Sequence, residues 1–440
     1  MRDRKIGFWE VASIGIGGMV GGGIFAVLGL TIDLAKGAAP LAFGVGGILA
    51  LLTGYSYAKL AVAYPSEGGS IEYIVQAFGN NLFSAIINNS LLISYVIMMA
   101  LYASAFASYG SVLVGIEGKW FKDLLIAGVI LTFTIVNLFG AFLTGRSETI
   151  LVFVKVAILI GFVVLGFWTC NWERLSPVHW ETPLKIITGG LIIFLAYEGF
   201  ELIANATRDA IDPARTIPKA LYFSITFVTL LYISIAVVAV GNVPFEVAKG
   251  ASDYVLAIAA QPFLGHLGFV IISVAALIST ASAINATIYG AGRAGYLIAK
   301  LGEIPAQFAY HLEHGYEGMI ILGLLAILFG VSFNLESISI AGSIGFLLLF
   351  SLVNLANFKL RARTGGNPVI SLAGFIGTSI ALGILVYYNL IHSPEKLASS
   401  LIAMLGVALF TIIYYNFGKR LRRVLDPTLR RELEEKLNSK

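Results

Sequence analysis

The sequence predicts an all-α polytopic membrane protein, and three features of the 440-residue chain support this prediction. Apolar residues make up 58% of the chain and charged residues only 12%, against roughly 25% charged residues in soluble globular proteins. The apolar residues gather in stretches that are long enough to cross a bilayer as helices. These stretches are continuously apolar, which excludes the short alternating strands of a membrane β-barrel.

Twelve stretches are expected to form the membrane-spanning helices. They cover residues 8–34, 41–63, 82–114, 124–143, 147–169, 184–208, 217–241, 263–299, 318–335, 338–358, 369–390 and 398–417. An even number of spans places both termini on one side, and Lys and Arg concentrate in the loops of that side. Because cytoplasmic loops carry more basic residues, we expect a multi-pass protein of the cell membrane with both termini in the cytoplasm. The expected division is a transmembrane domain over 1–416 and a cytoplasmic tail over 417–440.

Two of the predicted spans are interrupted. The first carries several glycines between Gly15 and Gly23, although each lowers the stability of a helix by about 1 kcal/mol relative to Ala. The sixth carries Glu198, Gly199 and Glu201 at mid-membrane depth. If the first ten spans are two repeats of five, these two spans correspond, and paired interruptions of this kind indicate an inverted-repeat transporter. The alternative is that the glycines only permit close packing of helices.

Four motifs, in order along the chain, resemble those of the amino acid-polyamine-organocation (APC) superfamily. Residues 21–25 resemble its G-x-G-I-F segment, residues 65–73 its P-x-x-G-G-x-x-x-Y signature, and residues 194–201 its sixth-span motif. Residues 212–220 resemble a further element in which Asp212 replaces an Asn. Segments 152–159 and 263–290 are most similar to the proton-coupled archaeal amino acid transporters of this superfamily.

The resemblance implies a five-plus-five inverted repeat (the LeuT fold) in which helices 1 and 6 are unwound. Repeat one would cover about 8–169, repeat two about 184–358, and two added C-terminal helices about 369–417. The implied function is that of an amino acid permease, a secondary active transporter that works by alternating access. Its partners would be an amino acid, protons and the lipid bilayer, and the oligomeric state stays open.

The two interruptions predict where the charged groups of an amino acid would bind. Free backbone N–H groups at the start of a half-helix suit its carboxylate, and carbonyl groups released in the sixth span suit its ammonium group. Glu198 either faces the cavity and contacts the substrate, or points to another helix and pairs with a hydroxyl, or is protonated and has no role. Tyr102 and Phe200 are candidate gates, and residues 245–260 are expected to form an extracellular lid. The expected substrate-binding residues are Gly18, Val20, Gly21, Gly22, Gly23, Ile24, Phe194, Ala196, Tyr197, Glu198 and Gly199.

Lys155 is the basic residue that the loops do not account for, because it lies in the middle of the fifth span. A buried ammonium group is costly unless it is paired, and such a group can release and rebind a proton during a transport cycle. The resemblance implies that Lys155 takes the place of a coupling cation beside Ser279 and Ser282 of the eighth span. The alternative is that its side chain reaches out to the membrane surface. The expected function is proton-coupled import of amino acids; the alternatives are an exchanger independent of sodium and protons, or a carrier of polyamines or cationic amino acids.

Other function classes are disfavoured by what the sequence lacks. One cysteine and five scattered histidines give no metal site, and no cofactor is expected. No dense basic cluster accompanies a soluble aromatic-rich domain, which argues against nucleic-acid binding. An enzyme would need clustered catalytic side chains, and a channel would need charge rings or pore loops. The sequence shows neither, so no enzymatic activity is expected and a channel is disfavoured.

Overall fold

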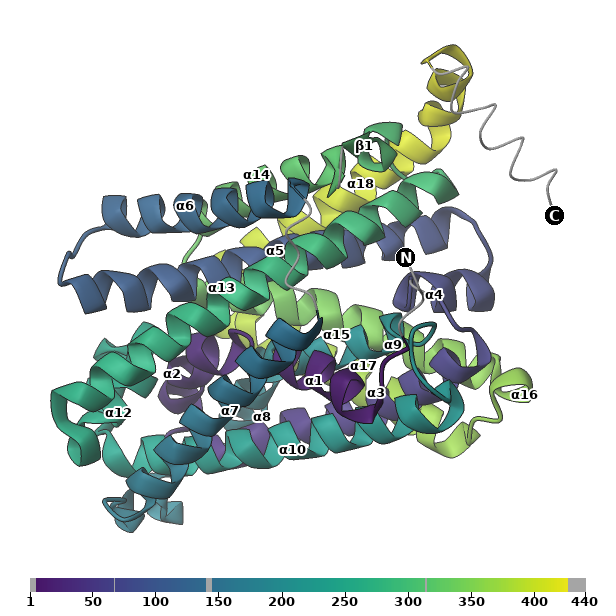
Figure 1. The fold of residues 1–440 in the computed structure, drawn as a ribbon. Coiled ribbons are helices and arrows are strands. Elements are labelled where there is room, and N and C mark those ends of the chain that lie inside the picture. Colours follow the sequence, from purple (N-terminus) through teal and green to yellow (C-terminus); the bar gives the residue numbers. More distant parts are fainter. Residues whose placement is uncertain (1–4, 67, 140–144, 313–314, 426–440) are drawn as a thin grey trace.

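The computed structural model describes residues 5–66, 68–139, 145–312 and 315–425, and this part of the chain is almost entirely helical (Figure 1). Within these residues, ten helices or continuous helical stretches are long and apolar enough to cross a membrane. An eleventh crossing is a pair, α1 (Phe8–Met19) and α2 (Gly23–Ala35), which is bent by 45° at its break. The ninth predicted stretch forms a shorter apolar helix, α14 (Glu317–Ser332). The chain is a multi-pass α-helical membrane protein, as the sequence predicts.

The long helices follow the predicted stretches closely. The twelfth stretch, expected to end at residue 417, continues as one helix to Leu425, so the expected tail begins inside a helix. The fourth stretch, expected at 124–143, forms a helix that begins five residues earlier, at Lys119, and ends at Leu138; residues 140–143 of that prediction lie outside the described residues. The other long helices begin and end within a few residues of the expected positions. The long helices are α3 (Ala39–Ala63), α5 (Leu82–Val114), α6 (Lys119–Leu138), α7 (Gly145–Phe167), α10 (Pro213–Asn242), α13 (Gln261–Leu301), α15 (Leu335–Lys359), α17 (Pro368–His392) and α18 (Pro394–Leu425).

The sixth stretch changes its helix type in the middle. It consists of α8 (Pro183–Ile192), the 3₁₀-helix η3 (Ile193–Phe200) and α9 (Glu201–Asn205). The predicted departure from an α-helix is therefore present, but the chain tightens into 3₁₀ turns where unwound backbone was expected. Long 3₁₀ segments are uncommon because their hydrogen bonds have poorer geometry, and inside a helix they often mark a functional hinge.

Short elements connect the spans. The expected lid is formed by α11 (Phe245–Gly250), the 3₁₀-helix η4 (Ser252–Tyr254) and α12 (Val255–Ala259), and η4 packs so closely on α2 that a Cβ on Gly29 would overlap Ser252. The helix α4 (Ser70–Phe78) lies after α3. The remaining short elements are α16 (Arg361–Thr364), η1 (Trp172–Leu175), η2 (Pro177–His179), η5 (Ala306–Ala309) and the two-residue strands β1 (His311–Leu312) and β2 (Gly315–Tyr316).

The helices form two groups that correspond between the two repeats. In one group α1 packs on α10 and η3, and α3 packs on α10. In the other, α5 packs on α6, α13 and α14 (Figure 1). The first group contains spans one, two, six and seven, and the second contains spans three, four, eight and nine. Equivalent spans of each half therefore occupy equivalent groups, which is the arrangement expected of an inverted repeat.

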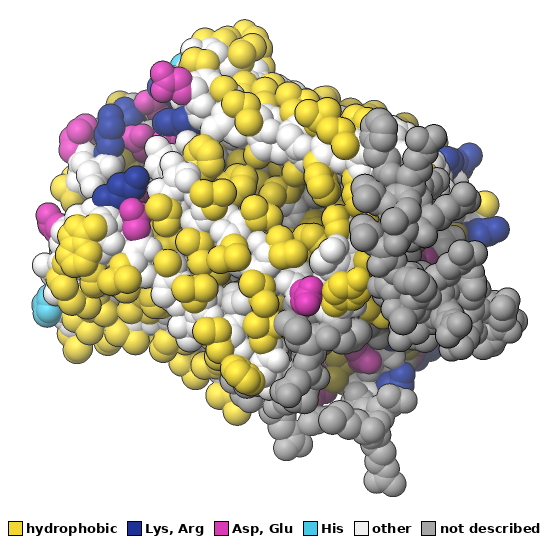
Figure 2. Space-filling view, turned by 90° about the horizontal axis from the view of Figure 1, so that it is seen from above, with side chains coloured by type: hydrophobic (Ala, Val, Ile, Leu, Met, Phe, Trp, Pro, Cys, Tyr) yellow, Lys and Arg dark blue, Asp and Glu magenta, His cyan; other side chains and the backbone are white. Residues whose placement is uncertain are grey.

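The outer face of the bundle is apolar. Large side chains such as Ile402 and Leu405 of α18 are 70% and 66% exposed. Figure 2 shows hydrophobic side chains across the middle of one face, with most of its charged side chains gathered towards the ends. An apolar surface of this extent suits lipid and would promote aggregation in water.

Two glycines bring the backbones of α1 and η3 close together, and a side chain at either position should destabilise the protein. A Cβ on Gly18 would lie 3.0 Å from the Cα of Gly199, and a Cβ on Gly199 would overlap the backbone of Gly18. We expect Gly199→Ala to lower the free energy of unfolding by about 1–3 kcal/mol through overpacking. Thermal unfolding in detergent would measure this loss.

Gly161→Ala is the matched control, because a Cβ on Gly161 of α7 has no atom within 4 Å. That change should be neutral or stabilising, since Ala favours a helix more than Gly does by about 1 kcal/mol. Equal melting temperatures for Gly199→Ala and the unchanged protein would contradict the packing argument.

Candidate functional site

The interruptions of the first and sixth spans meet in the interior of the protein. Gly18 lies against Gly199, and a Cβ on Gly23 would lie 2.7 Å from the Cα of Ala196. The predicted site residues Val20 and Ile24 are fully buried beside them. The structure thus brings together most of the predicted substrate-binding residues of the first and sixth spans.

The break between α1 and α2 leaves backbone N–H donors without a partner in the helix. Because α2 begins at Gly23, the N–H groups of Gly23, Ile24 and Phe25 have no carbonyl partner within the helix. The positive end of the helix dipole lies at the same place. This first turn can therefore hold an anionic group without any basic side chain.

Tyr232 of α10 links the two interruptions, and the sequence analysis did not identify it. Its hydroxyl donates a hydrogen bond to the carbonyl oxygen of Met19 at 2.6 Å and lies 3.4 Å from that of Ala196. The hydroxyl has one proton, so its hydrogen bond goes to Met19, but the same oxygen lies beside the carbonyl group of the second break. A tyrosine inside a long apolar span was the available signal, but the chain has 19 tyrosines and nothing in the sequence distinguishes this one.

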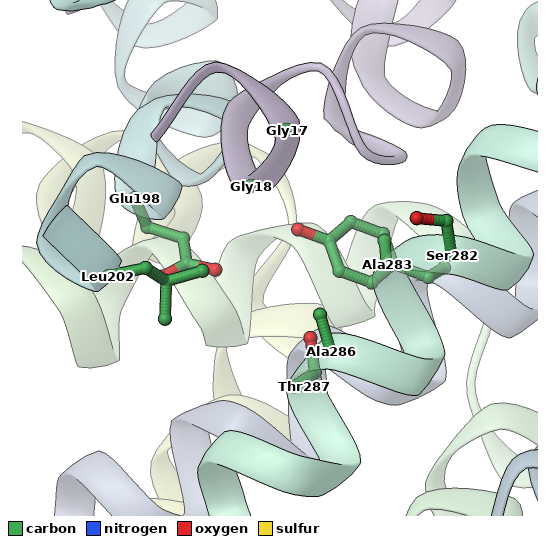
Figure 3. A pocket seen from close by; sticks show the side chains of 9 residues that line it. Gly17, Gly18, Glu198, Leu202, Ser282, Ala283, Ala286 and Thr287 are labelled. Atoms are coloured by element: carbon green, nitrogen blue, oxygen red, sulfur yellow. The ribbon is translucent and has the colours of Figure 1, made fainter. Parts of the chain in front are cut away.

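A small cavity lies beside the breaks, between the two groups of helices. Glu198 and Leu202 lie on one side of it and residues of α13 on the other (Figure 3). The space left for a water-sized sphere is about 20 Å³, which is room for a water molecule. The lining residues are Gly17, Gly18, Tyr102, Glu198, Leu202, Ser282, Ala283, Ala286 and Thr287.

Glu198 contributes the acidic group of this cavity. Its side chain is only 4% exposed, and its Oε2 atom has no hydrogen-bond partner among the described residues. A buried carboxyl oxygen without a partner is costly, and a bound cation or proton would remove that cost. The side chain of Glu198 therefore lines the cavity, and its contact with a substrate stays a prediction.

Glu201, one turn further along the chain, has the opposite environment. It accepts hydrogen bonds from Tyr95 at 2.5 Å, from Ser70 at 3.0 Å and from Tyr57 at 3.1 Å. These hydroxyls come from α5, α4 and α3, so the carboxyl group joins three other elements to the sixth span. Its oxygen atoms are occupied by the protein itself, and it is not among the residues that line the cavity.

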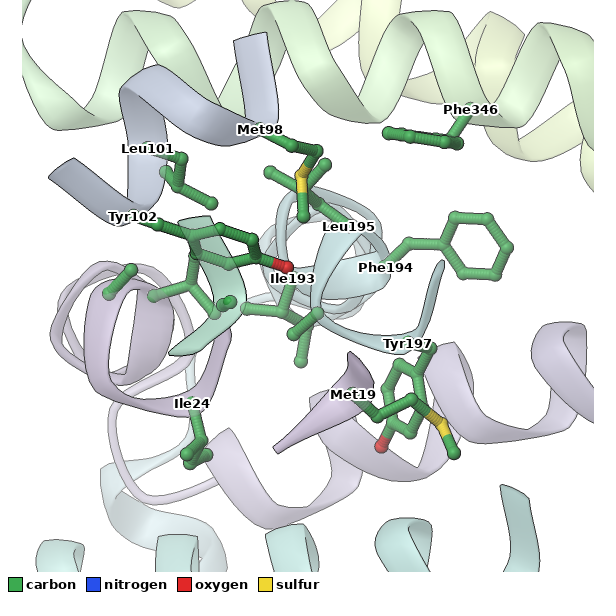
Figure 4. Packing of buried hydrophobic residues seen from close by; sticks show 14 of the residues in the cluster. Met19, Ile24, Met98, Leu101, Tyr102, Ile193, Phe194, Leu195, Tyr197 and Phe346 are labelled. Atoms are coloured by element: carbon green, nitrogen blue, oxygen red, sulfur yellow. The ribbon is translucent and has the colours of Figure 1, made fainter. Parts of the chain in front are cut away.

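The aromatic residues divide between the cavity and the packed core. Tyr102 lines the cavity, and a Cβ on Gly22 would overlap its ring. Phe194 points away from Tyr102 (Figure 4), and its ring packs on that of Phe350 with centroids 5.7 Å apart. The hydroxyl of Tyr197 donates to the carbonyl oxygen of Phe43 at 2.8 Å. The other candidate gate, Phe200, packs on Tyr57 and Phe350 and is not among the lining residues.

Lys155 is 2% exposed in the middle of α7, a helix that packs on α1, α10 and α13. On α13, Ser282 lines the cavity, and Ser279 is fully buried with an Oγ that has no partner among the described residues. The three residues predicted to couple protons therefore lie on helices that contact one another. Within the described part of the chain, His, Cys, Asp and Glu form no group of three or more that could hold a metal ion.

Proteins of known sequence resemble this chain over nearly its whole length. An uncharacterised protein of Methanocaldococcus jannaschii is 35% identical, with 96% of this chain and 97% of that protein covered. The inner membrane transport protein YbaT of Escherichia coli is 34% identical, with 96% and 98% covered. The branched-chain amino acid permease BcaP of Lactococcus lactis is 26% identical, with 94% of each chain covered.

A solved structure shows a similar fold. A mutant of the manganese transporter of Eremococcus coleocola has a TM-score of 0.63 at 14% sequence identity, with 92% of this chain and 95% of that chain covered. This likeness supports the LeuT fold for the present chain and carries no information about its substrate. A family model described as amino acid permease matches residues 6–417, and the chain therefore belongs to the amino acid permease family of the APC superfamily.

Proposed function

We propose that this protein imports amino acids by proton symport through alternating access. The observation that carries the proposal is the meeting of two interrupted helices beside a buried cavity that contains one unpaired carboxyl oxygen. The name of the Lactococcus lactis relative, a branched-chain amino acid permease, supports an amino acid as the substrate. In this proposal both termini lie in the cytoplasm, and the lid α11–η4–α12 faces outward.

In the proposed binding mode the main chain recognises the charged groups that all amino acids share. The N–H groups of Gly23 and Ile24 hold the carboxylate, with Gly21 and Gly22 giving the chain room to approach. The carbonyl of Ala196 holds the ammonium group after the Tyr232 hydroxyl moves off it. Such a site is strict for the amino acid head group and tolerant of its side chain.

Lys155 is proposed to carry the coupling proton. Its ammonium group is buried on a helix that contacts both α1 and α13, so its charge acts where the two helix groups adjoin. When the lysine is protonated, it would take the place of a cation near Ser279 and Ser282. When it is neutral, that charge is lost and the contact between the groups weakens. Tyr102 and Phe200 are proposed to move during this change.

An extracellular latch would hold the lid in the present conformation. Lys122 of α6 lies 3.6 Å from the Asp253 carboxylate of η4 and donates a hydrogen bond to Ser108 of α5 at 3.3 Å. Ser108 in turn donates to the same carboxylate at 3.3 Å. The lid is thus tied to the second helix group as well as to α2.

The coupling role of Lys155 can be tested by transport in proteoliposomes. Uptake by the unchanged protein should rise as the external pH falls and should be indifferent to Na⁺. Lys155→Ala should abolish the pH dependence, because the titrating group is removed. Lys119→Ala, an exposed lysine at the start of α6 and outside the lid, is the control and should transport normally.

A pH-dependent uptake that persists in Lys155→Ala would refute this assignment. Strong stimulation of uptake by amino acid inside the vesicles, at every pH, would favour the exchanger instead.

The role of Glu198 generates a separate prediction. If its carboxyl group binds the ammonium group or a cationic side chain of the substrate, Glu198→Gln should raise KM about 10- to 100-fold. This range corresponds to a hydrogen bond between charged groups worth about 1.5–3 kcal/mol. Comparing KM for neutral and cationic amino acids would show which group it binds, because only cationic substrates would be affected in the second case.

Glu395→Gln, an exposed acid at the start of α18 and outside the lid, is the matched control. An unchanged KM in Glu198→Gln for all substrates would leave Glu198 without a role in binding. A loss confined to cationic substrates would place this protein with its relatives named cationic amino acid transporters in Arabidopsis thaliana.

A further inference from the structure

Glu303 is a fully buried acid outside the membrane-spanning helices. It follows the end of α13, where Gly302 has a φ of 82°. The N–H of Gly302 bonds to the carbonyl oxygen of Ala299 at 2.9 Å, and that of Glu303 bonds to Ile298 at 3.0 Å. These two bonds are the Schellman pattern that ends many helices. The position of Glu303 is therefore fixed by the helix end itself.

Two neighbouring asparagines of α5 hold this residue. The side-chain amide of Asn89 donates to the backbone carbonyl of Glu303 at 3.3 Å. The Nδ2 of Asn88 donates to the Oε2 of Glu303 at 2.9 Å. An amide and a carboxyl group thus face each other in the protein interior, joined by one hydrogen bond.

The other half of this pair is unsatisfied. The Oδ1 of Asn88 and the Oε1 of Glu303 are both buried, and neither has a hydrogen-bond partner among the described residues. Both atoms are acceptors when Glu303 is ionised, so they cannot bond to each other. One proton on Oε1 would turn that oxygen into a donor to Oδ1 and would satisfy both atoms at once. Buried polar groups in native proteins are nearly always satisfied.

We infer that Glu303 binds a proton and forms a cyclic acid–amide pair with Asn88, which makes this position a proton-binding site separate from the transport cavity. The ligand is a proton from the aqueous side near the end of α13. The pair ties α5 to the connection between α13 and η5. Loss of the proton leaves a buried carboxylate against an amide oxygen and weakens that tie. The inference does not depend on the proposed transport function.

Among the described residues, no ion pair or hydrogen bond joins the side chain of Glu303 to a charged side chain. Helix α5 contains no charged residue, and neither does η5. The bases near the end of α13, Arg293 and Lys300, lie over the rings of Tyr289 and Tyr296 of the same helix. Glu317, at the start of α14, is also an acid and cannot neutralise a carboxylate at Glu303. Burial raises the pKa of Glu303 to about 7, and the hydrogen bond from Asn88 opposes part of that rise.

The direction of the pH effect follows from that raised pKa. The folded protein keeps the proton up to about pH 7, whereas a Glu in the unfolded chain releases it at about pH 4.3. The contribution to stability is therefore complete below pH 4.3, is lost as the pH rises to about 7, and is constant above that.

Thermal unfolding of the full chain in detergent, between pH 5 and pH 8, tests this site. Glu303→Gln keeps an amide in place of the acid and can bond to Asn88 without a titrating proton. We expect the melting temperature of the unchanged protein to fall across this range relative to that of Glu303→Gln. Glu246→Gln, which removes an exposed acid, should follow the unchanged protein.

Infrared difference spectroscopy of the unchanged protein gives a second measurement that needs no stable variant. A protonated carboxyl C=O band should be present at pH 6, should convert to carboxylate by pH 8, and should be missing in Glu303→Gln. The inference would be overturned if the melting temperatures of the unchanged protein and of Glu303→Gln changed by the same amount between pH 5 and pH 8. A spectrum with no protonated carboxyl band that titrates in this range would also overturn it. Neither readout requires transport, so failure here is distinguishable from failure of the proposed symport.

Discussion

The structure depends on how a helix can be broken inside a membrane. Water is absent from the hydrocarbon core, so each backbone group released by a break needs a partner within the protein. The two breaks solve this together: they lie against each other through Gly18 and Gly199, and the hydroxyl of Tyr232 donates to the carbonyl group of Met19 and lies beside that of Ala196. The breaks must therefore face the interior, and α10 must lie beside both of them. The position of the cavity follows from this arrangement.

The buried acids of the sixth span illustrate how such an interior divides structure from function. Glu201 accepts three hydroxyl hydrogen bonds from three other elements, and its contacts are complete without any ligand. Glu198, three residues earlier, faces the cavity with an oxygen that the described residues do not satisfy. A protein that only needed stability would gain by pairing or replacing that oxygen. Its incomplete contacts favour a role in binding.

Much of this fold could be predicted, because membrane spans are determined by long apolar runs. Helix α5 begins and ends at the predicted residues, and the first break lies among the predicted glycines. We considered broken helices and close helix packing as alternative reasons for the glycines. In the structure, glycines of the first span lie at its break and also allow it to pack closely on the sixth span. The 3₁₀ form of η3 and the role of Tyr232 could not be predicted, because both depend on contacts between distant spans. Helix α4 was missed because it is too short to cross a membrane.

The location of each buried ionisable group decides what its protonation can affect. Glu198 lies on η3 of the first helix group, and Lys155 lies on α7, which packs on that group. Helix α13 of the second group lines the cavity opposite Glu198 and also contacts α7. In the proposed mechanism, a change of charge there would alter contacts between the groups, as alternating access requires. Glu303 and Asn88 both belong to segments of the second group. A proton at that site therefore changes the cohesion of one group and leaves the interface between the groups in place. The two sites can respond to pH independently.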